Sequence, residues 1–182
     1  MNTKKKAMSD IEEFILSGKK CMLITGTHQY KKHVLAMAII DKLYKNANVL
    51  FRASGVEHAF TTPNILGQFV NKKAKAGEVF KIRNNFYSVD SYTRRDTWNK
   101  TASRFNFAIV FSIDGITSNP KYIESIENLF NDKQVDKIFL VSWTDHGHDD
   151  ISIYNQFVDA KTIYDVEEED VHYHRRVLGL ED

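Results

Sequence analysis

The chain has little of several features that would define its class. Its single cysteine, Cys21, excludes an internal disulfide framework and the small secreted domains that such frameworks stabilise. No apolar run approaches the roughly 20 residues that a membrane-spanning helix needs. The basic start, Met1–Lys6, is followed by acids where a signal peptide has its apolar stretch. We therefore expect a cytoplasmic protein that is not associated with a membrane.

An excess of one charge is also missing, since 25 Lys and Arg stand against 24 Asp and Glu. The balance hides two segments of opposite sign. Lys72–Arg104 is basic, and Asp145–Asp170 is acidic. Such segments either steer a polyanion toward one face or are solvated surfaces that neutralise each other in the fold. At 182 residues, the whole chain (1–182) is expected to form one domain with a substantial core.

Unbroken apolar runs alternate with patterns typical of helices. We expect strands at Cys21–Thr25, Asn48–Ser54, Phe107–Ile113, Lys137–Trp143 and Lys161–Asp165, with a hairpin at Val79–Ile82 and Asn85–Val89. We expect helices at Ile11–Leu16, Tyr30–Asn46, Thr93–Arg104, from Pro120 onward and at Ile151–Val158, and a helix or strand at Val171–Leu178. Apolar strands separated by helices are typical of parallel sheets. The predicted fold is an α/β three-layer sandwich with a mainly parallel central sheet.

Ligand sites in such folds lie along the edge where the strands have their carboxyl ends. Right-handed connections between parallel strands would bring all of these ends to one edge. Gly26, Ser54, Asp114 and Thr144 follow four of the expected strands. We therefore expect the functional residues near this edge.

The most informative stretch runs from Cys21 to His33. Gly26 is followed by four residues and then by Lys31, Lys32 and His33, which is the spacing of a phosphate-binding loop. Backbone N–H groups and a lysine converge on the anion in such loops, and Lys32 stands at the position of that lysine. Lys31 replaces a glycine, so its side chain is expected to strain the loop. His33 replaces the hydroxyl that would hold magnesium. An ordinary strand–helix turn accounts for the same residues.

Two later strand ends carry polar residues that suit the same chemistry. Asp114 ends an apolar strand, where nucleotide hydrolases have the acid that holds magnesium through water. An aspartate before glycine is also common in turns and helix caps. Ser142 lies at the end of the next strand, where a polar group could contact a terminal phosphate.

Together, these residues resemble the P-loop NTPase fold of the additional-strand group, which includes the AAA+ and RecA-like ATPases. The resemblance covers roughly Lys20–Asp165 and departs from the family pattern at Lys31, His33 and Gly115, the last standing in place of a glutamate. It implies ATP and Mg²⁺ as ligands, bound by Gly26, Thr27, Lys31, Lys32, His33, Asp114 and Ser142.

Degenerate members of such families serve as structural subunits or clamp-loader-like partners. The expected function is therefore a degenerate ATPase-like subunit with weak or absent nucleotide binding. It would act in a nucleic-acid-handling or mobile-element assembly, with a protein partner or as a homo-oligomer. The alternative is a protein-interaction module that kept the fold and lost the ligand.

Two further segments suggest other chemistry. Asp145–Asp150 contains His146 and His148, which with Asp114 would suit a metal-dependent nuclease; a solvated hydrophilic loop is the alternative. The basic segment interleaves cations with aromatic residues, which suits nucleic-acid binding. Its candidate contacts are Arg83, Arg94, Arg95 and Lys100. Arg94 and Arg95 could instead reach the nucleotide of a neighbouring subunit, or the segment could be a solvated helix packed through Trp98.

Overall fold

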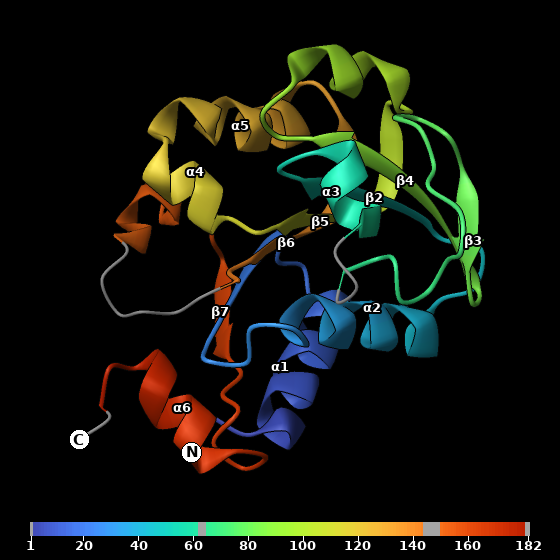
Figure 1. The fold of residues 1–182 in the computed structure, drawn as a ribbon. Coiled ribbons are helices and arrows are strands. Elements are labelled where there is room, and N and C mark those ends of the chain that lie inside the picture. The colour runs from blue at the N-terminus through green and yellow to red at the C-terminus, as the bar shows by residue number, and fades with distance from the viewer. Residues whose placement is uncertain (1, 62–64, 144–149, 181–182) are drawn as a thin grey trace.

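The described part of the chain forms a seven-stranded sheet with helices on both faces (Figure 1). The computed structural model describes residues 2–61, 65–143 and 150–180. The strands are β1 (Cys21–Thr25), β2 (Asn48–Ala53), β3 (Phe80–Ile82), β4 (Asn85–Ser91), β5 (Arg104–Phe111), β6 (Gln134–Val141) and β7 (Ala160–Ile163). The α-helices are α1 (Lys4–Leu16), α2 (Lys32–Leu43), α3 (Val56–Thr61), α4 (Asp114–Ser118), α5 (Glu124–Asn131) and α6 (Val171–Val177). Short 3-10 helices are η1 (Arg95–Lys100), η2 (Pro120–Ile123) and η3 (Ile151–Tyr154).

The strand order is β3-β4-β2-β5-β6-β1-β7, and every neighbouring pair is parallel except the β3–β4 hairpin. The predicted α/β architecture with a mainly parallel sheet is therefore confirmed. Strand β6 lies between β1 and β5, and Val141 at its end is paired with both Ile24 and Phe111. These three strands therefore end level with one another, which brings Gly26, Ser142 and Asp114 to one edge. Thr144 lies outside the described residues.

Side chains on the two faces of the sheet enter two apolar cores. Ile24, Phe51 and Val141 pack on the side of α1 and α2, in a core that also contains Ile11 and Ile40. Leu23, Val110 and Leu140 pack in a second core with Ile126 and Leu129 of α5. Figure 1 shows α1 and α2 on one side of the sheet and α4 and α5 on the other. Burial on both faces explains why the strands are continuous apolar runs rather than alternating ones.

Two expected helices are much shorter than predicted. The expected helix at Thr93–Arg104 is reduced to the 3-10 helix η1, because Arg104 already belongs to β5 and is paired with Gln134. The helix expected at Ile151–Val158 is reduced to η3. None of the helices in the described ranges is long and apolar enough to cross a membrane.

Candidate phosphate-binding site

The loop between β1 and α2 comprises residues 26–31. The backbone of Lys31 in this loop is unstrained. Lys31, the N-cap of α2, has φ −118° and ψ −6°, a region open to all residues. The backbone angles of Lys31 therefore show none of the strain that was expected from its side chain. Gly26 has φ +116°, and a Cβ at this position would collide with the backbone of Tyr164. Only glycine meets both requirements at the start of the loop.

Lys32 connects the ends of two strands. It is the first residue of α2 and is completely buried. Its Nζ donates hydrogen bonds to the carbonyl oxygens of Gly26 and Trp143, the latter at 3.3 Å. A buried ammonium group requires such acceptors, because the loss of water otherwise makes the charge very costly. The lysine of the predicted motif is thus held at the carboxyl edge of the sheet.

Asp114 reaches the same point from β5. Its Oδ2 accepts a hydrogen bond from the backbone N–H of Trp143 at 2.6 Å. The backbone of Trp143 is therefore bound by Lys32 through its carbonyl group and by Asp114 through its amide group. The structure brings together Gly26, Lys32 and Asp114, which are three of the residues that the sequence singled out.

A side chain at the position after Asp114 would require Tyr92 to move. A Cβ on Gly115 would collide with the hydroxyl group of Tyr92. Tyr92 is buried, and this burial raises the pKa of its hydroxyl group to about 12. The hydroxyl group beside Gly115 is therefore a neutral phenol at physiological pH.

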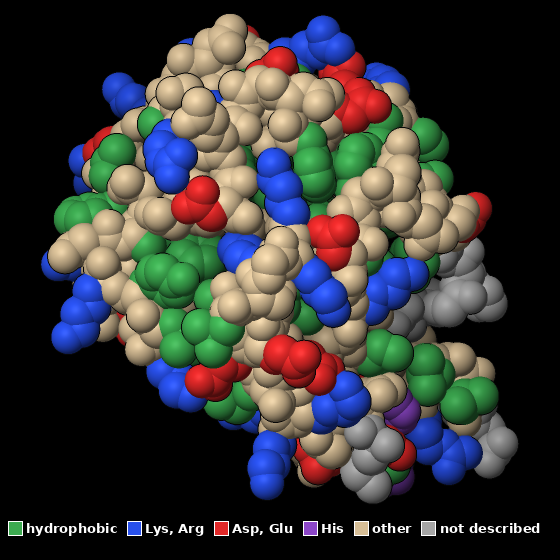
Figure 2. Space-filling view, turned by 180° about the vertical axis from the view of Figure 1, so that it is seen from behind, with side chains coloured by type: hydrophobic (Ala, Val, Ile, Leu, Met, Phe, Trp, Pro, Cys, Tyr) green, Lys and Arg blue, Asp and Glu red, His purple; other side chains and the backbone are tan. Residues whose placement is uncertain are grey.

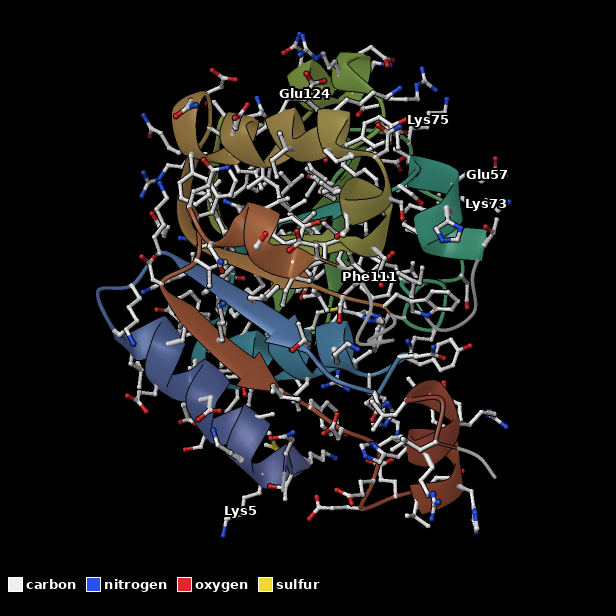
Figure 3. All side chains as sticks on the ribbon, turned by 90° about the vertical axis from the view of Figure 1, so that its left-hand side faces the viewer. Lys5, Glu57, Lys73, Lys75, Phe111 and Glu124 are labelled. Carbon is white, nitrogen blue, oxygen red and sulfur yellow. The ribbon has the colours of Figure 1, made fainter. Side chains whose placement is uncertain are left out.

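His33 packs against an aromatic residue of the core, and Ser142 continues the sheet. His33 is buried, and its ring packs 4.4 Å from the ring of Phe111, which lies in the interior (Figure 3). The N–H of Ser142 continues the sheet by donating to Ile24 at 3.1 Å. Because side chains alternate and Val141 faces α2, Ser142 is placed on the opposite side of the sheet. Its buried hydroxyl has no hydrogen-bond partner among the described residues.

A segment near the end of the chain covers the loop, and we call residues 165–177 the C-terminal strap. The N–H of Thr27 donates to Asp165 Oδ1 at 2.9 Å. The N–H of His28 donates to the carbonyl oxygen of Tyr164, just before the strap, at 3.2 Å. Lys31 Nζ donates to Glu169 Oε2 at 2.7 Å. Some loop amides are therefore already occupied by the chain itself.

Glu169 is the electrostatic centre of this contact. Its Oε2 also lies 3.3 Å from His28 Nε2, and its Oε1 accepts a hydrogen bond from the Tyr164 hydroxyl at 3.0 Å. The ammonium group of Lys31, with help from Tyr164 and His28, lowers the pKa of Glu169 to about 2. Burial lowers the pKa of His28. At neutral pH the contact therefore joins a carboxylate, a neutral imidazole and an ammonium group.

The sequence did not single out the strap residues as part of the site. Asp165 ends the expected strand Lys161–Asp165, and no spacing rule connects Glu169 or His174 to the loop. One feature of the sequence could have suggested the contact. The acids that are dense before Asp170 have the opposite charge to the three consecutive basic residues that begin with Lys31.

The candidate nucleic-acid contacts do not form one group. Arg94 and Lys100 both pair with Asp96, at 2.8 and 3.6 Å, and Arg95 pairs with Glu124. Arg83 precedes β4 and the other three follow it, so a strand about 20 Å long separates them. On the face in Figure 2, Lys and Arg side chains lie among Asp and Glu side chains rather than forming one basic field.

The predicted metal cluster cannot be placed from this structure. His146 and His148 lie outside the described residues. Within the ranges that the structure describes, no group of three His, Cys, Asp or Glu side chains could hold a metal ion. Of the three predicted ligands, only Asp114 is described, and its carboxylate binds the Trp143 amide.

Comparison with known proteins assigns no family. The chain matches no protein-family model and no curated protein by sequence. Its class is therefore defined by the fold alone: an α/β protein with a mostly parallel sheet between helical layers. At the carboxyl edge of that sheet, a buried lysine, a glycine and an aspartate meet around one backbone segment.

Proposed function

We propose that the chain is a degenerate P-loop-type domain that binds the phosphates of a nucleotide weakly through Lys32 and does not hydrolyse them. The position of Lys32 carries the proposal. It begins a helix directly after β1, and its ammonium group lies between carbonyl oxygens at the carboxyl edge of the sheet. A helix N-terminus that carries a lysine attracts phosphate.

The order of the strands supports the same proposal. An additional strand, β6, separates the loop-bearing strand β1 from the acid-bearing strand β5. This arrangement agrees with the additional-strand group that the sequence resembles. The connection from β1 runs through the loop directly into α2, so the loop and the helix N-terminus lie at the edge where α/β sheets bind ligands.

The residues around the loop fit magnesium poorly, which is the reason for proposing weak binding without hydrolysis. Magnesium prefers hard oxygen ligands, and the first turn of α2 carries His33, whose ring packs in the core. A side chain at the position after Asp114 would collide with the hydroxyl group of Tyr92. We therefore derive no catalytic step for this site.

A non-hydrolysing domain of this kind would act through partners. We place it as a subunit of a nucleic-acid-handling or mobile-element assembly, on the strength of the sequence resemblance. The second candidate is an interaction module without a ligand. It is favoured by one observation, namely that the amides of Thr27 and His28 already donate to the chain itself.

Isothermal titration calorimetry with ATP and GTP tests the proposal. We expect weak binding to the unmodified protein and none to Lys32→Met, which keeps the side-chain length and removes the charge. Lys42→Met is the matched control, because Lys42 lies in the last turn of the same helix and pairs with Glu12 at the surface. Thermal unfolding checks that both variants are folded.

Two results would reject the nucleotide proposal. One is the absence of heat from the unmodified protein at millimolar ATP and GTP. The other is equal binding by the Lys32 and Lys42 variants. Either result would favour the interaction module. The nucleic-acid role is checked separately by its salt dependence, because binding through phosphate contacts weakens steeply as salt rises.

A further inference from the structure

The C-terminal strap contacts several residues of the loop between β1 and α2. Besides its bond to Asp165, Thr27 has its hydroxyl 2.7 Å from His174 Nδ1. The hydroxyl of Tyr173 donates to the side-chain oxygen of Gln29. With the ion pair between Lys31 and Glu169, these contacts tie both ends of the loop to the strap.

The strap offers carboxylates to the groups that could bind an anion. Asp165 Oδ1 accepts from both the N–H and the hydroxyl of Thr27, at 2.9 and 3.2 Å. Glu169 Oε2 lies within hydrogen-bond distance of both His28 and Lys31. A phosphate group at the loop would use the same classes of donor: backbone amide, hydroxyl and ammonium.

The strap is attached mainly through polar contacts, several of them partly buried, and its buried apolar side chains are Val166 and Val177, which lie outside the two apolar cores. Tyr164 is the last described residue that belongs to either core. The side chain of Glu169 is 39% exposed, and the first residue of α6, Val171, is 48% exposed. Figure 1 shows α6 beside the N-terminus and apart from the other helices. Segments with few buried apolar contacts open locally at low free-energy cost, without unfolding the rest of the protein.

We propose that the C-terminal strap is an acidic cover that opens as a unit and controls access to the loop. The contacts of Glu169 contribute most to holding it closed. If the proposed function is right, on which this last step rests, a phosphate ligand must displace the carboxylates of Asp165 and Glu169. The closed strap would then lower the affinity of the loop for phosphate, in addition to the effect of the residues of the loop itself.

Hydrogen exchange without any ligand tests the strap directly. Glu169→Gln removes the charge that Lys31 and His28 contact while preserving the size of the side chain. We expect amide exchange in residues 26–31 and 165–177 to become about tenfold faster, a value from the low end for charge-assisted hydrogen bonds because Glu169 is partly exposed. Tyr173→Phe, which removes only the bond to Gln29, should have a smaller effect of the same kind.

Glu167→Gln is the matched control, because it removes the same charge from the same exposed segment. Unlike Glu169, Glu167 makes none of the contacts described between the strap and the loop. Its exchange should equal that of the unmodified protein. Equal exchange in the Glu169 and Glu167 variants would overturn the strap, whatever the loop binds.

Titration with inorganic tripolyphosphate then separates the strap from the proposed function. Tighter binding by Glu169→Gln than by the unmodified protein, with faster exchange of the strap when the anion is bound, supports both. Faster exchange in Glu169→Gln without any anion binding supports the strap and rejects the nucleotide proposal. Binding that is equal in all variants and leaves strap exchange unchanged rejects the strap.

Discussion

Replacing Asp90 with asparagine should remove one half of a completely buried ion pair and destabilise the fold severely. The side chains of Arg52 and Asp90 are both 0% exposed. Nε and Nη2 of Arg52 donate to the two carboxylate oxygens, each at 2.7 Å. The guanidinium group also donates to the carbonyl of Ser125 and to Asn128, and it lies 4.9 Å from the centre of the Trp98 ring. With strand β2 on one side and these partners on the other, Arg52 has no path to water.

The magnitude follows from this enclosure. Asparagine has nearly the volume of aspartate, so Asp90→Asn leaves no cavity and its effect is that of an uncompensated charge. Removing one partner of a buried pair costs about 3–5 kcal/mol. The total free energy of unfolding of a domain is about 5–15 kcal/mol, so this single change removes a large part of it. Urea unfolding followed by circular dichroism measures the loss.

A second arginine–aspartate pair provides the control. Arg94 donates to both carboxylate oxygens of Asp96, at 3.1 and 2.8 Å, but the two side chains are 66% and 52% exposed. Asp96→Asn should leave the unfolding midpoint where it is, because exposed pairs contribute little. Equal midpoints for the two variants would refute the reasoning from burial. Arg52→Met combined with Asp90→Leu should recover part of the loss, since neither member of the pair is left buried without the other.

Two further predictions concern the loop and its cover. The protection of the strap should be complete above about pH 4.5, the ordinary pKa of glutamate, and should fall as the pH falls. The lowered pKa of Glu169 gives this loss, which extends from about pH 4.5 to its own pKa of about 2. Amide exchange across this range, corrected for the intrinsic rate, measures it; protection that increases on acidification would contradict the assignment. Gly26→Ala should destabilise the protein by about 2 kcal/mol or more in thermal unfolding, because its φ is +116° and the added Cβ has no space. Gly18→Ala, where nothing lies within 4 Å, should change stability by less than about 0.5 kcal/mol, and equal losses at both positions would contradict this explanation.

The sheet could be predicted from the sequence because each strand is marked by its own short run of apolar residues. The runs at Cys21–Thr25 and Phe107–Ile113 are apolar at nearly every position, and only a strand buried on both faces requires that pattern. Once the strands are known to be parallel, the positions of Gly26 and Asp114 at one edge follow. The helix expected at Thr93–Arg104 was wrong because the pairing of Arg104 with Gln134 in the sheet overrides the local helical pattern.

The strap could not be predicted because its contacts depend on the completed fold. Thr27 and Asp165 are 138 positions apart in the chain, and no periodicity or spacing relates them. They meet because β7 lies beside β1 and the chain leaves both strands at the same edge. The ion pair between Lys31 and Glu169 of the strap depends on the completed fold in the same way.

Gly26 and Lys32 both indicate a phosphate-binding loop in the sequence, but the structure explains the two residues differently. Gly26 is required by the backbone of Tyr164, so it is explained without any ligand. No such steric clash requires Lys32, and the burial of its ammonium group carries a free-energy cost. Lys32→Met should therefore keep or raise the thermal stability of the protein while it removes nucleotide binding. A large loss of stability would instead make Lys32 a structural residue, and the case for a phosphate ligand would fall with it.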